Sequence, residues 1–105
     1  MAATTTITGV GALNKVHFFD SDLSDTAVPV FTSGRYVQNI IIEGGAAAEI
    51  VIFRGIADTP VWFRVPVAIA GSVHFEFSGK GLFLPNLEII TASASTGLTV
   101  AIFYA

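Results

Sequence analysis

The sequence predicts an all-β fold, a sandwich of about eight strands with a jelly-roll-like arrangement. Short runs of alternating apolar and polar residues recur along the chain, which is typical of strands with one buried side. Glycine, proline and small polar residues separate these runs at intervals of about 8–12 residues, the spacing expected of a β-sandwich. No segment combines the 3.6-residue apolar period of a helix with helix-capping residues. A jelly roll, in which two Greek keys make eight strands, fits this count.

The N-terminal segment is rich in threonine and is predicted to form an extended arm over 1–13, ahead of a sandwich domain over 14–105. Threonine and isoleucine favour extended backbone where a neighbour offers a sheet edge. A disordered terminus is the alternative interpretation. The candidate contact residues of the arm are Thr4, Thr5, Thr6 and Ile7.

The strands of the sandwich follow one another with short connections. The proline residues Pro60 and Pro66 flank or interrupt one of them, and proline cannot donate a ladder hydrogen bond. That strand is therefore expected to lie at a sheet edge or to carry a bulge. The predicted strand segments are 15–19, 28–32, 35–43, 49–54, 61–67, 72–78, 82–84, 86–92 and 98–104.

Several strands are apolar on both sides. Alternation over 72–78 places Val73, Phe75 and Phe77 toward the core. In 35–43 the same rule puts Tyr36 on one face with Ile40 and Ile42. The strands 49–54 and 98–104 have no clearly polar face. Because a two-layer sandwich needs only one apolar face per sheet, an identical subunit is expected to cover the remainder.

The composition excludes several classes of function. Hydrophobic residues make up 52% of the chain and charged residues 12%, against about 25% charged in an average soluble chain. The net charge is −3 and the five basic residues are scattered, so we expect no direct nucleic-acid contact. The chain contains no cysteine, and no apolar run reaches the ~18 residues of a membrane-spanning helix. We therefore expect no membrane partner.

The candidate chemical groups do not form a recognisable site. The acidic segment 20–25 lacks the EF-hand pattern, because its sixth and twelfth loop positions hold Asp25 and Phe31 rather than Gly and Glu. A solvated loop is expected there, with a divalent-ion site as the alternative. His17 and His74 lie on separate predicted strands. The sequence thus predicts no catalytic, cofactor or metal site, and no enzyme.

Three stretches carry a resemblance to a known class of proteins. They read GGAAAEIVIFRG, PVWFRVPVAIAGSVHFEF and GLFLPNLEIITASASTGLTVAIFYA, within about two-thirds of the chain from residue 40 onward. These stretches resemble small all-β structural proteins of tailed bacteriophage virions, of the capsid decoration (cement) type. The resemblance implies a virion protein without enzymatic activity. Decoration proteins of this kind are often trimers that sit over gaps in the capsid lattice.

These observations together predict a capsid decoration protein that stabilises the phage head by bridging capsid subunits. We expect a homotrimer, made in the host cytoplasm and bound to the major capsid protein on the capsid surface of the virion. The alternative is a ligand- or carbohydrate-binding module of a tail fibre or spike, with an exposed Trp62 and a sugar or metal near 20–25. Outside the arm, the residues expected to make contacts between subunits are Trp62, Ile102, Phe103 and Tyr104.

Overall fold

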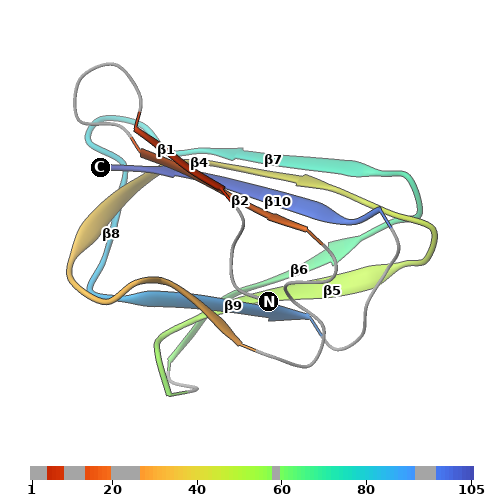
Figure 1. Cartoon of the computed structure of the whole chain (residues 1–105), viewed down its shortest axis with the longest axis horizontal. Coiled ribbons are helices and arrows are strands. Elements are labelled where there is room, and N and C mark those ends of the chain that lie inside the picture. Colours follow the sequence, from red (N-terminus) through yellow and green to blue (C-terminus); the bar gives the residue numbers. More distant parts are fainter. Residues whose placement is uncertain (1–4, 9–13, 20–26, 58–59, 92–96) are drawn as a thin grey trace.

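The computed structural model describes residues 5–8, 14–19, 27–57, 60–91 and 97–105, the first two segments by their backbone alone. These residues form ten β-strands in two layers (Figure 1). The strands are β1 Thr5–Thr8, β2 Asn14–Phe19, β3 Val28–Phe31, β4 Arg35–Glu43, β5 Glu49–Arg54, β6 Val61–Val67, β7 Ser72–Glu76, β8 Leu82–Leu84, β9 Leu87–Thr91 and β10 Thr99–Tyr104.

The strand order is that of a jelly roll. The first sheet runs β1-β2-β10-β4-β7, with β8 also paired to β4, and the second runs β3-β9-β5-β6. All pairings are antiparallel. Without β1 and β8, two four-stranded sheets remain, β2-β10-β4-β7 and β3-β9-β5-β6. The chain passes between these sheets in the pattern of two Greek keys, so the predicted all-β, jelly-roll-like sandwich is confirmed.

The strand boundaries match the alternation of the sequence closely. Four predicted strands, 35–43, 49–54, 61–67 and 82–84, have the observed ends. The others differ by one or two residues at an end, where ladders fray and assignments vary. Alternation locates strands well because each apolar residue on the inner side removes area from water.

Part of the predicted arm is a strand of its own. β1 pairs antiparallel with β2, from Thr5 opposite His17 to Thr8 opposite Asn14. The extended backbone expected for this segment thus meets a sheet edge of the same chain. Thr4 and the other residues of 1–13 outside β1 are not among the described residues. The acidic segment 20–25 also lies outside them.

The core fills the space between the two sheets. Val73, Phe75 and Phe77 pack against it and are half-buried, whereas His74 and Glu76 of the same strand are exposed, as alternation predicts. The largest fully buried side chains come from the central strands of both sheets and from the residue preceding β10: Phe53, Ile40, Ile42, Leu87, Ile89, Leu98, Ile102, Val37, Val51 and Val100.

A β-bulge in β4 corrects one expectation. Phe103 pairs with Asn39 but Tyr104 pairs with Val37, which leaves Gln38 as the extra residue. Past a bulge the inward and outward positions exchange. Val37 therefore joins Ile40 and Ile42 in the core, whereas Tyr36, expected on their face, is 37% exposed.

The proline-flanked strand β6 has both of the features expected of it. It is the edge strand of the second sheet, paired only with β5. Its register shifts where Phe53 pairs with Phe63 and Arg54 pairs with Val61, so Trp62 is the bulged residue. Pro66 lies opposite Ile50 on this edge strand, a position at which sheets tolerate proline.

Two turns are joined at one end of the sandwich, the right-hand end of Figure 1. The turn 44–48 links β4 to β5, and the turn 68–71 links β6 to β7. The amide of Gly44 donates to the carbonyl of Gly71 at 2.7 Å, and the amide of Ala70 donates to the carbonyl of Gly45 at 3.0 Å. Ala70 has a φ of 53°, in the left-handed region that an alanine adopts only at a cost of about 1 kcal/mol. These backbone bonds hold the two turns as one unit.

Gly44 has to be glycine for this unit to form, which gives a first prediction. A Cβ at this position would lie 2.2 Å from the carbonyl oxygen of Ala68. We expect Gly44→Ala to lower the free energy of unfolding by about 2 kcal/mol or more, because backbone must move and two hydrogen bonds are disturbed. Urea denaturation monitored by circular dichroism measures the change.

The matched control is Gly71→Ala in the partner turn. There the nearest atoms to an added Cβ lie 3.2 Å away, which a small shift relieves. We expect less than half the effect of Gly44→Ala. Equal destabilisation by both substitutions would show that the close approach at Gly44 is not what holds the turns together.

Candidate contact surfaces

Two of the residues expected to contact a partner belong to the core of the chain itself. Ile102 is 0% exposed and Tyr104 is 9% exposed. The Tyr104 ring packs on the ring of Phe31 from the opposite sheet, with 5.2 Å between the centroids. These side chains join the two sheets of one subunit, so they have almost no surface to offer to another subunit.

Phe103 lies on the other side of the same strand. It is half-buried on the outer face of the first sheet, where its backbone is opposite Lys15 of β2 and Asn39 of β4. Its neighbour Ala101 is 9% exposed and adds little surface. Of the three residues predicted in β10, Phe103 alone presents area on an outer face.

Trp62 is not an open platform. It is half-buried and packs against the core, and its indole Nε1 is buried without a hydrogen-bond partner among the described residues. The bulge explains this placement, because it sets two consecutive residues, Trp62 and Phe63, against one residue of β5. Both then pack against the core, whereas strict alternation put Trp62 on the opposite face.

Beside Trp62, aromatic rings close the open side of the sandwich between its edge strands β6 and β7. Phe63 of β6 stacks on Phe75 of β7 with centroids 6.2 Å apart and an interplanar angle of 19°. Phe77 lies 6.2 Å from Phe63 and 6.5 Å from Phe75, and Phe53 meets Phe63 edge-on at 6.4 Å. All but Phe53 are half-buried, so this seam is an apolar closure of the subunit.

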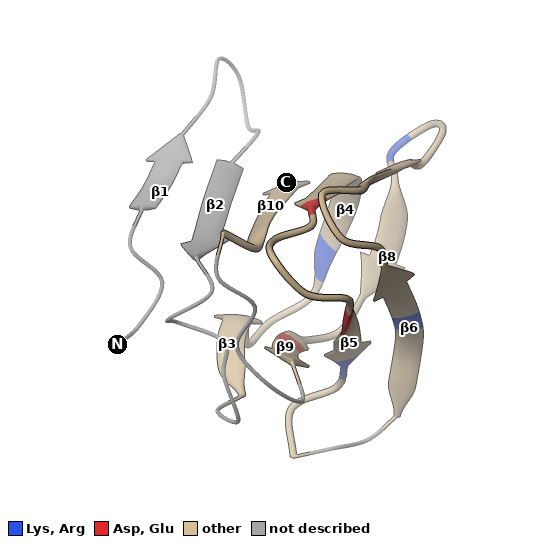
Figure 2. Cartoon of the chain, turned by 90° about the vertical axis from the view of Figure 1, so that its right-hand side faces the viewer, with Lys and Arg blue, Asp and Glu red and all other residues tan. Residues whose placement is uncertain are grey.

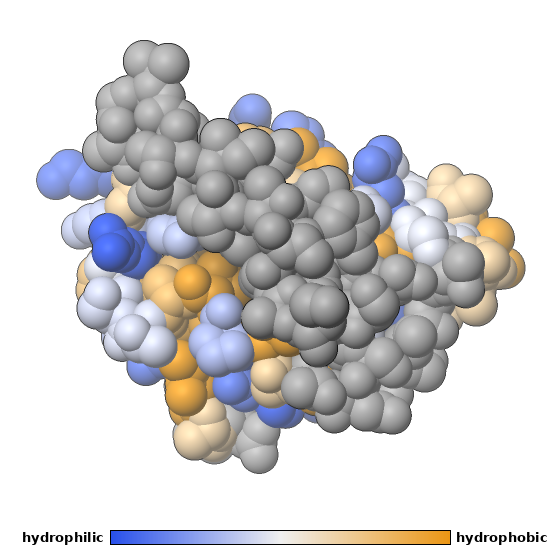
Figure 3. Space-filling model, viewed as in Figure 1, coloured by the Kyte–Doolittle hydropathy of each residue, from blue (hydrophilic) through white to orange (hydrophobic). Residues whose placement is uncertain are grey.

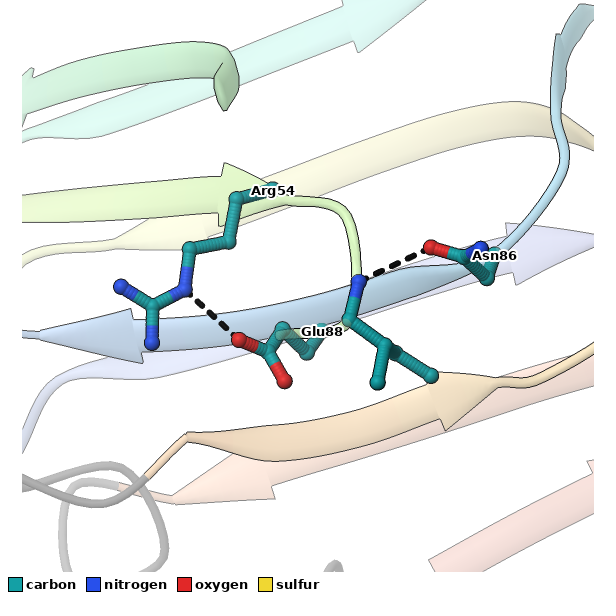
Figure 4. Close-up of polar contacts among 4 residues, drawn as sticks. Arg54, Asn86 and Glu88 are labelled. Atoms are coloured by element: carbon teal, nitrogen blue, oxygen red, sulfur yellow. Dashed lines mark hydrogen bonds and ion pairs between the residues drawn. The ribbon is translucent and has the colours of Figure 1, made fainter. Parts of the chain in front are cut away.

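A polar cluster holds the connection after β5 to the second sheet (Figure 4). Arg54 Nε donates to Glu88 Oε2 at 2.7 Å, and the backbone amide of Ile56 donates to Asn86 Oδ1 at 2.8 Å. The ion pair is little exposed, 18% for the arginine side chain and 8% for the glutamate. A carboxylate this buried requires such hydrogen bonds, so this cluster is a structural one.

An apolar surface is exposed at the end formed by the two joined turns. We call it the apolar tip and define it as 44–48, 68–71, Ile50 and Pro66. The turns contain only glycine, alanine and one isoleucine, Ile69, which is 64% exposed. Figure 2 faces this end, and Figure 3 shows apolar residues at its right-hand side.

A pocket adjoins the apolar tip, between the ends of the turns 44–48 and 68–71 that carry Ala48 and Ala68. It has a volume of about 570 Å³ and is lined by Ala48, Glu49, Ile50, Pro66, Val67 and Ala68. Its one carboxylate, Glu49, is 8% exposed and accepts a hydrogen bond from the amide of Ile50 at 3.2 Å. Volumes of roughly 300–1,000 Å³ are usual for binding pockets. Its size and its largely apolar lining suit an apolar side chain.

An aromatic pair is exposed at the other end of β4. Tyr36 and Phe83 are opposite one another on β4 and β8, and their rings meet edge-on with centroids 5.2 Å apart. Phe83 is 52% exposed and its ring lies over Gly34, where a Cβ would come within 2.7 Å of it. This pair offers an aromatic surface of the kind that was expected at Trp62.

The described part of the chain contains no candidate metal site. Within those residues, no three His, Asp or Glu side chains lie close enough together to bind a metal ion. His74 is exposed on β7, and the side chain of His17 lies outside what the structure describes. None of the described segments forms a helix long and apolar enough to cross a bilayer.

The apolar tip is not among the features predicted from the sequence, although its signal is plain. Turns are normally rich in Asn, Asp, Ser and Pro, whereas GGAAA and AIAG contain no polar side chain. Alternation within strands does not show that these two turns are neighbours.

Comparisons of the chain with protein-family models, with curated proteins and with solved structures find no match.

The Arg54–Glu88 pair gives a second prediction. We expect Glu88→Ala and Arg54→Ala each to cost about 2–3 kcal/mol, because each leaves a little-exposed charge without this partner. The double variant should cost less than the two losses together by about 1–2 kcal/mol. Arg64→Ala, which removes an exposed cation from the neighbouring strand, is the control and should change stability by less than about 0.5 kcal/mol. Strict additivity in a urea-denaturation cycle would show that the pair contributes no coupling energy.

Proposed function

We propose that the chain is a non-enzymatic structural protein of a bacteriophage particle, a capsid decoration protein that works as a homotrimer on the capsid surface. The observation that carries the proposal is the apolar tip, an exposed end of the sandwich whose two turns contain no charged residue. Exposed apolar surface of this kind marks a site for another protein. The resemblance of the sequence to virion proteins supplies the phage context.

A decoration protein acts by bridging subunits of the shell. A standard interface of about 1,600 Å² at about 25 cal/mol per Å² supplies roughly 40 kcal/mol of gross hydrophobic free energy. Association costs offset most of this. The net binding free energy adds to the work needed to separate neighbouring copies of the major capsid protein. A sandwich with a fully packed core transmits that load without rearranging.

The first sheet offers a place for the contact with the shell. β1 is its last strand in the described chain, so the outer edge of Thr5, Thr6 and Ile7 has no neighbour there. An open edge can accept a strand of a second protein through backbone hydrogen bonds. Phe103 adds an aromatic side chain to the outer face of the same sheet. This sheet edge would bind the major capsid protein, leaving the apolar tip for sister subunits.

The test of this function is the location of the protein in phage particles. Antibodies raised against the purified chain are applied to gradient-purified particles of the phage that encodes it, and gold labels are counted by electron microscopy. We expect label spread over the whole head. Label confined to the tail tip, or equal to that of pre-immune serum, would reject a decoration role.

The alternative, a carbohydrate-binding module of a tail fibre or spike, is favoured by one observation, the exposed Tyr36–Phe83 pair. Aromatic rings with exposed faces are common platforms for apolar faces of ligands. This function predicts binding to a glycan array that Phe83→Ala abolishes and that Val61→Ala, at another exposed apolar residue, leaves unchanged. No binding by the wild-type chain would remove the alternative.

A further inference from the structure

The apolar tip has an exposed apolar side chain and, next to it, an apolar pocket. Ile69 projects from the turn 68–71 as the most exposed large hydrophobic residue of the described chain, at 64%. The pocket of about 570 Å³ adjoins this turn, walled by Ala48, Ile50 and Pro66. An exposed apolar side chain and an apolar pocket on one surface complement each other between two copies.

We propose that sister subunits assemble through this tip, with Ile69 of one copy inserted into the pocket of the next. The inference rests on the homo-oligomer of the proposed function and names its interface. When Ile69 of each copy enters the pocket of the next in one direction, the contact is heterologous and closes into a ring if the rotation fits, whereas reciprocal insertion would give a two-fold dimer. A trimer is the ring we expect.

Charge favours a second copy at this place. Each chain carries a net charge of −3, so two copies repel one another at most orientations. The turns 44–48 and 68–71 contain no ionisable residue, and Glu49 in the pocket wall is 8% exposed. The exposed Glu43 ends β4 just before the turn 44–48, on the outer side of the first sheet and away from the pocket between β5 and β6. Two copies that meet through the turns and the pocket side therefore keep their exposed Glu43 side chains apart. The lack of Lys, Arg and aromatic residues in these turns disfavours an anionic lipid surface as the partner.

The area available fits a contact that uses the side of the tip as well as its end. The molecule measures 27 × 24 Å across its two shorter axes, about 500 Å² as an ellipse. A stable interface buries about 800 Å² per partner. Ile50, 45% exposed, and Pro66 extend the apolar surface from the end onto the outer side of β5 and β6. The subunits would thus meet at an angle, as subunits of a ring do.

The backbone prepares the tip for this role. The hydrogen bonds from Gly44 to Gly71 and from Ala70 to Gly45 fix the two turns relative to each other before any contact forms. Little conformational entropy is then lost on association, which leaves more of the hydrophobic free energy as affinity.

The first experiment measures mass by light scattering after size exclusion, over a dilution series. We expect the wild-type chain to have three times the 11.0 kDa of one chain. Ile69→Asp should have the mass of one chain, with the association weakened at least roughly 30-fold, the loss typical of a central anchor. Val61→Asp, at a 45% exposed valine outside the tip, should remain trimeric. Circular dichroism and urea midpoints confirm that both variants fold.

The second experiment uses the absence of cysteine from the chain to locate the contact. Ile69→Cys and Ala48→Cys are made as separate single-cysteine chains, distinguished by a tag, mixed and mildly oxidised. We expect a disulfide-linked dimer of one chain of each kind, because only close residues can form the bond. Ile69→Cys mixed with Phe83→Cys should give none.

The outcomes separate the interface from the function. A trimer that persists in Ile69→Asp, or oxidation that links no Ile69→Cys chain to an Ala48→Cys chain, overturns the tip interface and leaves the proposed homotrimer standing. A wild-type chain that is monomeric at its highest soluble concentration overturns the self-assembly itself, and the tip would then serve a different protein such as the major capsid protein. Monomeric Ile69→Asp together with the mixed disulfide supports the inference.

Discussion

The pairing of β10 between β2 and β4 is the constraint on which the first sheet depends. The sheet order places β10 in the middle, with β2 and β1 on one side and β4, β7 and β8 on the other. Its inner side chains, Val100, Ile102 and Tyr104, are also part of the core. The amides of Tyr36 and Ala105 donate to each other's carbonyl groups at 2.9 Å and prolong the ladder. The first sheet can therefore close only after the last strand has been added, which makes folding depend on contacts distant in sequence.

Strand positions and the inner faces followed from the sequence, because alternation records which side chains leave water. The order of the strands in each sheet could not be predicted, because alternation does not show which strand pairs with which. The two β-bulges could not be predicted from alternation either. Each inserts one residue, Gln38 or Trp62, and exchanges inward and outward positions beyond it. The exposure of Tyr36 and the half-burial of Trp62 are the direct results, and a sequence pattern cannot show a shift that depends on the partner strand.

Many of the apolar residues that suggested a partner pack against other residues of the same chain. Ile102 and Tyr104 join the sheets, and Phe63, Phe75 and Phe77 close the seam between β6 and β7. Apolar residues on both sides of a strand are thus weak grounds for assembly by themselves. Of the five exposed large hydrophobic side chains in the described chain, Ile50 and Ile69 belong to the apolar tip, Tyr36 and Phe83 form one pair, and Val61 lies apart from both. The tip and the pair are the two surfaces that can distinguish a structural subunit from a ligand-binding module.

The apolar tip combines an exposed apolar surface with one residue in a costly backbone conformation. Ala70 has a φ of 53°, a conformation that glycine or asparagine adopts at lower cost. Asparagine there would also place a polar side chain on the surface. A turn that retains alanine at this position, beside an isoleucine that is 64% exposed, gives up stability and solubility together. Burial of the turns against a second copy, as proposed, would remove this apolar area from water. The backbone strain would remain, as it does at Ala57 in the connection after β5, where φ is 70°.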